Sequence, residues 1–212
     1  MERTTRVAGP ARTNVHLLAD ERTREAIAID CAIPSLAWIR DELDARGWTL
    51  KLIVSTHHHW DHMGDNAAVQ AHTGADIAVH ALDRHGLTDP QPLWAPFPIP
   101  PCVPAVELAE GGVVRFGSIE LTVLHTPGHT EGSVCLLDRA SGILLSGDTL
   151  MAGAFGRVDL PGGSPEAMVA SLDRLRGLDD AVAVLPGHGR ETTIGEERRW
   201  MEWIATRGRL PD

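Results

Sequence analysis

The feature that most limits the fold of this chain is a histidine-rich segment at residues 56–62, Thr-His-His-His-Trp-Asp-His. It follows a short apolar, β-branched run at 50–55, which predicts that a strand delivers it. Four histidines in six residues are rare by chance, and histidine is the commonest protein ligand of metal ions. The segment therefore predicts a metal site at the end of a strand.

The spacing within the segment predicts which side chains act together. Side chains two residues apart share a face of an extended segment, so His57 and His59 can bind one ion, and His58 points away. Asp61 and His62 reach a neighbouring position, which favours a second ion. Carboxylate and imidazole donors suit zinc, iron or manganese rather than calcium.

Three further apolar runs lead into residues that can bind metal ions. The run at 121–124 leads to His129, the run at 143–145 to Asp148, and the run at 182–185 to His188. Each connecting loop has a glycine before its metal-capable residue, and glycine lets the backbone turn sharply. A solvated polar loop or an accidental histidine run would not explain these three residues, so we expect all four loops to meet at one sheet edge.

The composition is that of a globular protein. The chain has 212 residues, of which 43% are hydrophobic and 23% charged, and it fits one large domain at roughly 150 residues per domain. Its formal net charge of −10 argues against non-specific nucleic-acid binding. The sequence has no apolar run long enough to span a membrane and no apolar run of a signal peptide near its start. We expect a soluble, cytoplasmic protein; the sequence leaves the oligomeric state open.

Apolar periodicity and turn residues predict alternating groups of strands and helices, which argues for sheets covered by helices. The polar, proline-rich stretch 88–104 predicts a surface loop. We expect helices over 35–46, 64–72, 165–176 and 196–206. We expect strands over 12–19, 26–31, 50–55, 76–80, 113–116, 119–124, 133–137, 143–145 and 181–185.

We expect structural roles for the cysteines, and for the histidines and the tryptophan that are not candidate metal ligands. Cys31, Cys102 and Cys135 are an odd number without a C-x-x-C pair, which predicts reduced, buried thiols. We expect His58 at the rim of the site or behind its ligands, and Trp60 in the wall of the site. We expect His72 and His85 on the surface, and His16, His80 and His125 as structural histidines in or at the ends of strands.

Four motifs together resemble the metallo-β-lactamase superfamily. They are His57-x-His59-x-Asp61-His62, His125-Thr126-Pro127-Gly128-His129, Ser146-Gly147-Asp148-Thr149-Leu150 and Pro186-Gly187-His188-Gly189, with Asn14 and Asp30 at two further positions. The match covers about residues 12–200. The resemblance implies an α/β fold, a four-layer αββα sandwich with a dinuclear metal site at one edge. It also implies a single domain over residues 1–212, with no additional helical domain at the carboxyl end.

The resemblance assigns roles to the candidate residues. His57, His59 and His129 would hold one ion, Asp61, His62 and His188 the other, and Asp148 would bridge them. Asp61 and Asp148 are then candidate catalytic residues as well as metal ligands, and Asp30 would orient ligands from behind. We expect two divalent ions, zinc first, with iron or manganese as alternatives.

A narrower resemblance is to short hydrolases of the glyoxalase II type. It is carried by Asp148-Thr149-Leu150, by the loop 156–163 and by Thr193-Ile194-Gly195-x-Glu197-Arg198. The family places a basic residue near its glutathione thioester where this chain has Arg157, which is a candidate substrate contact; an ion pair with Asp159 is the alternative. The chain has no tyrosine, and Cys31-Ala32 follows Asp30 where the family has Pro-Gly. These departures affect glutathione recognition rather than the metal site.

The sequence thus predicts a metal-dependent hydrolase of a small molecule, foremost a thioesterase that cleaves S-lactoylglutathione or a related thioester. A bound metal ion lowers the pKa of its water to about 7, and the resulting hydroxide would attack the thioester carbonyl. The thiolate leaves readily, because an ordinary thiol has a pKa of about 8.5.

Other functions stay open. A persulfide dioxygenase shares the fold but uses one iron, and it typically has Ala-His-Asp at the position of residues 186–189. A lactonase or other ester hydrolase is a further alternative, although lactonases of the superfamily use a tyrosine. A β-lactam hydrolase fits less well, since its zinc enzymes have cysteine or serine at the position of Asp148. A non-catalytic metal-binding scaffold would have lost a ligand position, and here all seven are filled.

Overall fold

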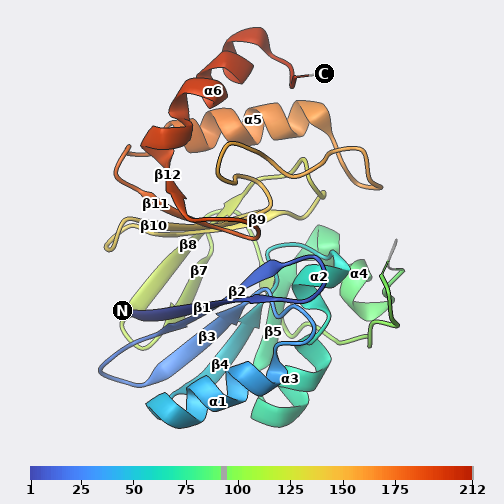
Figure 1. Ribbon diagram of the computed structural model, residues 1–212, viewed down its shortest axis with the longest axis vertical. Helices are drawn as coiled ribbons and strands as arrows, with labels where there is room; N and C mark the ends of the chain where they lie inside the picture. Colours follow the sequence, from blue (N-terminus) through green and yellow to red (C-terminus); the bar gives the residue numbers. More distant parts are fainter. Residues whose placement is uncertain (92–94, 212) are drawn as a thin grey trace.

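The computed structural model describes residues 1–91 and 95–211. Two six-stranded sheets pack against each other, and helices cover the outer face of each sheet (Figure 1). This is the αββα sandwich that the sequence predicts, so the predicted fold class is confirmed.

The first sheet has the strand order β1-β2-β3-β4-β5-β6. Strands β1 to β3 pair antiparallel, and β3 to β6 pair parallel. Its strands are β1 (Glu2–Ala8), β2 (Thr13–Ala19), β3 (Glu25–Ile29), β4 (Thr49–Val54), β5 (Asp76–His80) and β6 (Val106–Leu108).

The second sheet has the order β12-β11-β10-β9-β8-β7. Strands β7 to β10 form an antiparallel meander, β11 lies parallel to β10, and β12 is antiparallel to β11. Its strands are β7 (Val113–Phe116), β8 (Ile119–His125), β9 (Val134–Asp138), β10 (Ile143–Gly147), β11 (Ala183–Pro186) and β12 (Thr192–Thr193).

The helices divide between the two outer faces. Helices α1 (Leu36–Arg46) and α3 (Asn66–Thr73) pack on the first sheet, whereas α5 (Pro165–Arg176) and α6 (Ile194–Arg207) pack on the second (Figure 1). Short helical segments, α2 (Trp60–Met63), η1 (Ala81–Asp83) and α4 (Arg84–Thr88), lie in the connections. Both helices on the second sheet, α5 and α6, begin at a side-chain cap. In α5 the Ser164 hydroxyl accepts a hydrogen bond from the Ala167 amide at 3.2 Å.

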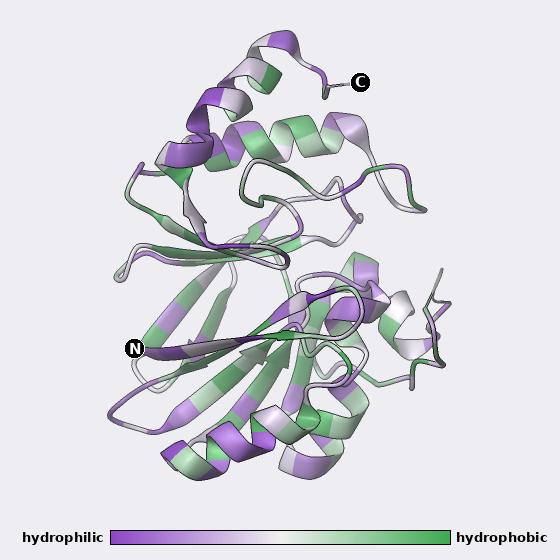
Figure 2. Ribbon diagram, viewed as in Figure 1, coloured by the Kyte–Doolittle hydropathy of each residue, from purple (hydrophilic) through white to green (hydrophobic). Residues whose placement is uncertain are grey.

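Three apolar layers hold the four structural layers together. Strand β3 shows why, because Ala26 and Ala28 pack toward the helices while Ile27 and Ile29 pack between the sheets. Both faces of such a strand are buried, and its sequence reads as a continuous apolar run rather than an alternating one. Figure 2 shows the central strands of the sheets largely green and the outward faces of the helices purple.

The expected strands and helices all form, with ends shifted by a few residues. The prediction missed β1, whose sequence Glu-Arg-Thr-Thr-Arg-Val-Ala has no apolar period because it is a charged edge strand. It also missed the short elements β6, β12, α2, η1 and α4. The expected helix 64–72 is wrong at its start, since Asp65 turns its carboxylate to accept the Leu36 amide at 2.8 Å and α3 begins only at Asn66.

The first residue of the predicted loop, Thr88, is the last residue of α4, and residues 89–91 and 95–104 form no helix or strand. Residues 92–94, including Pro92 of the predicted loop, lie outside the described residues. Cys31, Cys102 and Cys135 are free and buried, as predicted. Burial raises the pKa of the Cys102 and Cys135 thiols to about 11, so both stay protonated and unreactive at neutral pH. Across residues 1–91 and 95–211, no helix has the length and apolar character needed to cross a membrane.

Candidate metal centre

The candidate centre lies where loops of the two sheets are joined by backbone hydrogen bonds. The Val134 amide donates to the Thr56 carbonyl at 2.9 Å, which joins the second sheet to the loop after β4. Within the second sheet, the Gly187 amide donates to the Gly147 carbonyl at 2.8 Å. All seven predicted ligand residues extend from these loops and come together, as the sequence predicts. They are His57, His59, Asp61, His62, His129, Asp148 and His188.

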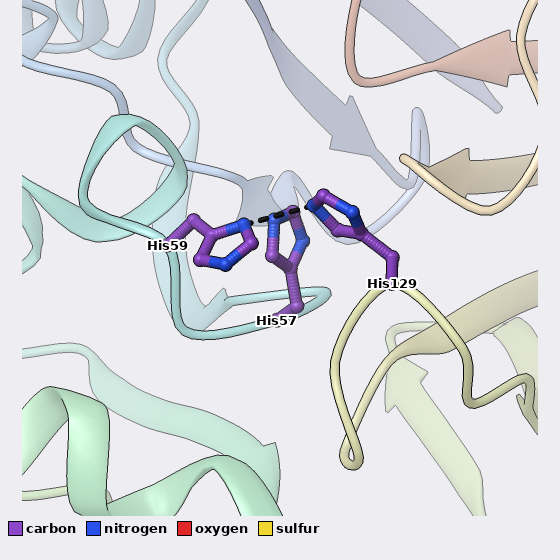
Figure 3. A group of neighbouring side chains, drawn as sticks. All are labelled: His57, His59 and His129. Atoms are coloured by element: carbon purple, nitrogen blue, oxygen red, sulfur yellow. Dashed lines mark hydrogen bonds between the residues drawn. The ribbon is translucent and has the colours of Figure 1, made fainter. Parts of the chain in front are cut away.

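Three histidines form the first group of donors (Figure 3). His59 Nδ1 lies 2.8 Å from His129 Nε2, and the centres of the three rings lie 4.5 to 4.8 Å from one another. One nitrogen of each ring lies within 4.8 Å of the others. Two of the rings come from the loop after β4 and the third from the loop after β8.

Asp61, His62 and His188 form the second group. His188 Nε2 lies 3.2 Å from both Asp61 Oδ2 and His62 Nε2. Asp148 lies between the two groups, with Oδ1 at 3.4 Å from His62 Nε2 and Oδ2 at 3.6 Å from His129 Nε2. This is the bridging position that the resemblance implies.

Hydrogen bonds fix how the rings face the centre. His62 Nδ1 donates to Asp30 Oδ2 at 2.9 Å, and His129 Nδ1 donates to the Arg157 carbonyl at 2.7 Å. His57 Nδ1 lies 3.1 Å from the Thr56 hydroxyl, which itself donates to Asp30 at 2.9 Å. Each of the three rings thus holds its Nδ1 hydrogen outward and presents the Nε2 lone pair to the centre.

The protonation of the first group favours metal binding. Burial lowers the pKa of His57 well below its ordinary value and that of His59 to about 3, and neighbouring histidine rings add to both shifts. Burial also lowers the pKa of His129. These imidazoles are neutral at physiological pH, and a neutral imidazole is the form that donates a lone pair to a metal ion.

The second group has the opposite electrostatics. Burial alone would lower the pKa of His62, but the Asp61, Asp148 and Asp30 carboxylates together raise it well above its ordinary value. Burial likewise opposes protonation of His188, and its contacts with Asp61 and Asp148 raise its pKa. This part of the centre is built around negative charge, which attracts protons and metal cations alike.

Two buried atoms test whether these residues fit a cation. His57 Nε2 and Asp148 Oδ1 are buried, and neither has a hydrogen-bond partner among the described residues. A buried polar atom without a partner costs free energy comparable to a lost hydrogen bond. Both atoms face the centre and both can donate a lone pair, so a bound cation would satisfy them.

Arg157 reaches the centre through its backbone rather than its side chain. Its carbonyl accepts from His129, while its guanidinium binds the Asp159 carboxylate through two hydrogen bonds of 2.8 and 2.7 Å. The ion pair is the alternative that the sequence left open. Arg157 is among the residues that line the cavity above the centre, and its role as a substrate contact stays a prediction.

Residues near the amino end of the chain also support the centre. The Asn14 side chain donates to the Pro186 and Gly189 carbonyls at 2.9 and 3.0 Å, which holds the loop that carries His188. The Thr13 hydroxyl donates to Asp61 Oδ2 at 3.0 Å. Asp30 contacts both Thr56 and His62, and its role in orienting metal ligands stays a prediction.

Asp83 is a supporting residue that the sequence analysis missed. Its buried carboxylate accepts from the His58 amide at 2.9 Å, the Thr130 hydroxyl at 2.7 Å and the Gly132 amide at 2.8 Å. Burial alone would raise its pKa, but these contacts and the His58 ring hold the pKa below its ordinary value. Asp83 therefore joins the two loops that carry the first donor group. No spacing in the sequence pairs residue 83 with residues 58 and 130.

The remaining histidines lie outside the two groups, as predicted. His58 turns away from them, and its Nδ1 lies 3.1 Å from Asp83 Oδ2. His80 and His125 stack with ring centres 4.2 Å apart and join the two sheets. His16 is buried against the Pro186 carbonyl, and His72 and His85 are exposed.

A cavity of about 730 Å³ opens over the candidate centre. Trp60, Met63 and Phe155 are among the residues that line it, so Trp60 walls the site as predicted. Five of the seven predicted ligands also border this cavity. They are His59, Asp61, His129, Asp148 and His188.

Comparison with known sequences identifies a family, relatives that are uncharacterized, and relatives that are named as enzymes. Residues 8–188 match the family described as the metallo-beta-lactamase superfamily. An uncharacterized protein of Aquifex aeolicus is 37% identical over 196 residues, which cover 90% of each chain. A hydroxyacylglutathione hydrolase of Maricaulis maris is 36% identical over 172 residues, which cover 81% of this chain but 60% of that enzyme.

The chain is also similar in fold to several solved structures. BLEG-1, a B3 metallo-beta-lactamase, aligns with a TM-score of 0.87 and 30% identity over 93% of this chain and 97% of its own. TTHA1623 in a di-iron-bound form aligns with a TM-score of 0.81 and 31% identity over 92% and 97%. ETHE1 from Myxococcus xanthus aligns with a TM-score of 0.76 and 27% identity over 100% and 92%.

Proposed function

The chain belongs to the metallo-beta-lactamase superfamily, and on that basis we propose that it is a metal-dependent hydrolase that cleaves a thioester. One observation carries the proposal: seven donor residues from both sheets converge, and two of their buried atoms have no partner among the described residues. The superfamily binds divalent metal ions, and the donor set here suits two of them, zinc first and iron or manganese as alternatives. The relatives named hydroxyacylglutathione hydrolase favour a thioester over other acyl substrates.

In this proposal His57, His59 and His129 hold one ion, Asp61, His62 and His188 the other, and Asp148 contacts both. Divalent ions bound there would supply hydroxide at neutral pH and polarise the substrate carbonyl.

The chain's own residues orient these groups and line the cavity. Asp30, Thr56 and the Arg157 carbonyl hold the hydrogens of three imidazoles away from the centre. Trp60 and Phe155 line the cavity and offer a substrate apolar contacts. The leaving thiolate needs no acid from the chain, because a thiol with a pKa of about 8.5 leaves well unprotonated.

The test is steady-state hydrolysis of thioesters, S-lactoylglutathione first, with the metal content measured on the same preparation. We expect metal-dependent hydrolysis with about two ions per chain, as the donor set implies. His72→Ala is a matched control, because His72 is an exposed histidine on α3 outside both donor groups.

A different result would favour a second function of the same superfamily. Oxygen uptake with glutathione persulfide, with one iron per chain, would replace hydrolysis by persulfide oxygenation, and the likeness to ETHE1 makes that arm worth including. Two bound ions without hydrolysis of any thioester would direct the search to lactones and other esters.

A further inference from the structure

The cavity over the candidate centre has mainly apolar walls. Trp60, Met63, Met151, Phe155 and Leu160 are the larger apolar residues that line it. Such walls bind apolar groups by removing them from water, and they offer charged groups no compensating partner. The part of a substrate that lies along these walls is therefore apolar.

The charged side chains at the mouth of this cavity are mostly acidic. Asp89 and Glu131 border it and are exposed. Arg157 also borders it, but its guanidinium binds the Asp159 carboxylate with two hydrogen bonds, so its charge is largely offset. Among the described residues that line the cavity, Arg157 is the single arginine or lysine.

The position of the donors fixes which part of a thioester meets this mouth. The reacting carbonyl has to approach the donor groups, at which the Asp61 and Asp148 carboxylates offset the charge of bound cations. Groups several bonds away from the carbonyl then extend to the mouth. In a glutathione thioester those groups include two carboxylates and one ammonium, so the net charge that would face Asp89 and Glu131 is negative.

We propose that the substrate of this hydrolase carries an uncharged thiol rather than an anionic one such as glutathione. The inference rests on the proposed thioesterase and specifies its substrate class. Like charges across a binding surface weaken binding and slow association, and dissolved salt screens both effects. The mouth therefore selects against an anionic thiol through KM, while the chemistry at the carbonyl, and hence kcat, depends little on the thiol's remote charges.

The experiment compares two thioesters with the same acyl group, S-lactoylglutathione and S-lactoyl-N-acetylcysteamine, on the metal-loaded enzyme. We expect kcat/KM to be about tenfold higher for the uncharged N-acetylcysteamine thioester at low ionic strength, mainly through KM. Adding salt should lower KM for the glutathione thioester and narrow the ratio, because the repulsion is screened.

Charge-neutralising variants test whether the mouth causes the difference. Glu131→Gln and Asp89→Asn should each narrow the ratio between the two thioesters about threefold. Asp76→Asn is the control, because it removes the same charge from an exposed residue that does not line the cavity. A ratio that narrows equally in the control would show that net charge, not the mouth, is responsible and would overturn the inference.

The two proposals fail in different ways. A kcat/KM for S-lactoylglutathione equal to or above that of the uncharged thioester would overturn the inference and leave the hydrolase standing. No hydrolysis of either thioester by enzyme with its metal ions bound would instead overturn the thioesterase on which the inference rests.

Discussion

The two sheets supply the candidate centre in different ways. The first sheet contributes four donors from one short segment, His57, His59, Asp61 and His62, at the end of a single strand. The second sheet contributes one donor from each of three loops, His129, Asp148 and His188. The donors of the first set are neighbours in sequence, whereas those of the second set come from segments that are distant in sequence.

This difference indicates where the centre is easiest to disturb. In the first sheet, Asp30 lies behind the segment and fixes Thr56 and His62 together. In the second sheet, the spacing between loops depends on close backbone approaches, such as that of Gly187 to Asp148, and on cross-links such as Asp83. We therefore expect substitutions outside the centre to displace the donors of the second sheet more than those of the first.

The largest expected effect is the loss of metal binding when a donor is removed, and it is the same for donors of both sheets. His59→Ala and Asp148→Ala each remove a donor, and we expect each to abolish metal loading and hydrolysis together. Metal analysis and steady-state kinetics on the same samples check this. Wild-type turnover in either variant after metal stripping would contradict the assignment of the centre.

A second prediction concerns the close approach at residue 187. A β-carbon there would meet Asp148 Oδ1, and it would lie 2.7 Å from His62 Cε1. Gly187→Ala should therefore displace two donors and lower metal affinity about 10- to 100-fold, as substitutions of supporting groups do. Competition with a chromophoric chelator measures this affinity.

Gly189→Ala is the matched control two residues away. Its β-carbon has open space, and its positive φ of 79° costs roughly 1 kcal/mol of stability for a residue with a side chain. We expect a lower unfolding temperature with unchanged metal affinity. Equal loss of affinity in both variants would mean that loop strain, not the contact with Asp148, controls the centre.

A third prediction distinguishes the effects of two buried carboxylates, Asp83 and Asp30, on metal binding. Asp83→Asn leaves one acceptor oxygen for the His58, Thr130 and Gly132 donors, and we expect affinity for the ion at His57, His59 and His129 to fall about 10- to 100-fold. Asp30→Asn should instead weaken binding of the ion at His62 most, because His62 contacts Asp30 directly, whereas His57 contacts it only through Thr56. Stepwise cobalt binding followed by absorbance distinguishes the two sites.

Asp138→Asn controls for burial of a carboxylate in that comparison. Asp138 is buried and accepts the Ala140 and Ser141 amides at 2.9 and 3.0 Å, away from both donor groups. It should cost about 1–3 kcal/mol of stability without changing metal affinity. If Asp83→Asn behaves in the same way, Asp83 stabilises the fold without positioning the donors.

The smallest expected effect concerns the acid stability of the second sheet. The Arg174 hydrogen bond lowers the pKa of Glu110 from 4.5 to about 2, and Glu110 also accepts the His125 amide at 2.8 Å, where the loop to His129 begins. Because the folded pKa is depressed, this contribution is present above pH 4.5 and is lost as pH falls toward 2.

Glu110→Gln measures that contribution. The pair is half exposed, so we expect it to contribute less than about 1 kcal/mol. Thermal unfolding at about pH 6 should show the variant slightly less stable than the wild type, and the difference should shrink at about pH 3. A difference that persists unchanged at the lower pH would exclude ionised Glu110 as its source.

Much of the fold could be predicted from the sequence, because buried strands and amphipathic helices have local signatures. Strands β3, β4 and β9 read as apolar runs, and α5 as a capped helix with an apolar face. Strand β1 could not be predicted in this way. It is a charged edge strand, and its full-length pairing with β2, from Glu2 opposite Ala19 to Ala8 opposite Thr13, creates it.

The candidate centre divides along the same line. The donor types were determined by the sequence, since histidine and aspartate at strand ends have few other roles in such numbers. The groups that hold the donors were set by the fold. The Arg157 carbonyl and the Asp83 carboxylate act on His129 and on its loop from positions that no local pattern connects to it.

The sequence by itself determined that four strand ends carry metal-capable residues, because side-chain type and spacing are local properties. Only the tertiary structure decided how those residues face one another and which supporting groups lie behind them. It also decided that Asp89 and Glu131 border the cavity together with Arg157, the single arginine among its described lining residues. These features depend on which distant segments the two sheets bring into contact, and that is fixed by burial of the three apolar layers together.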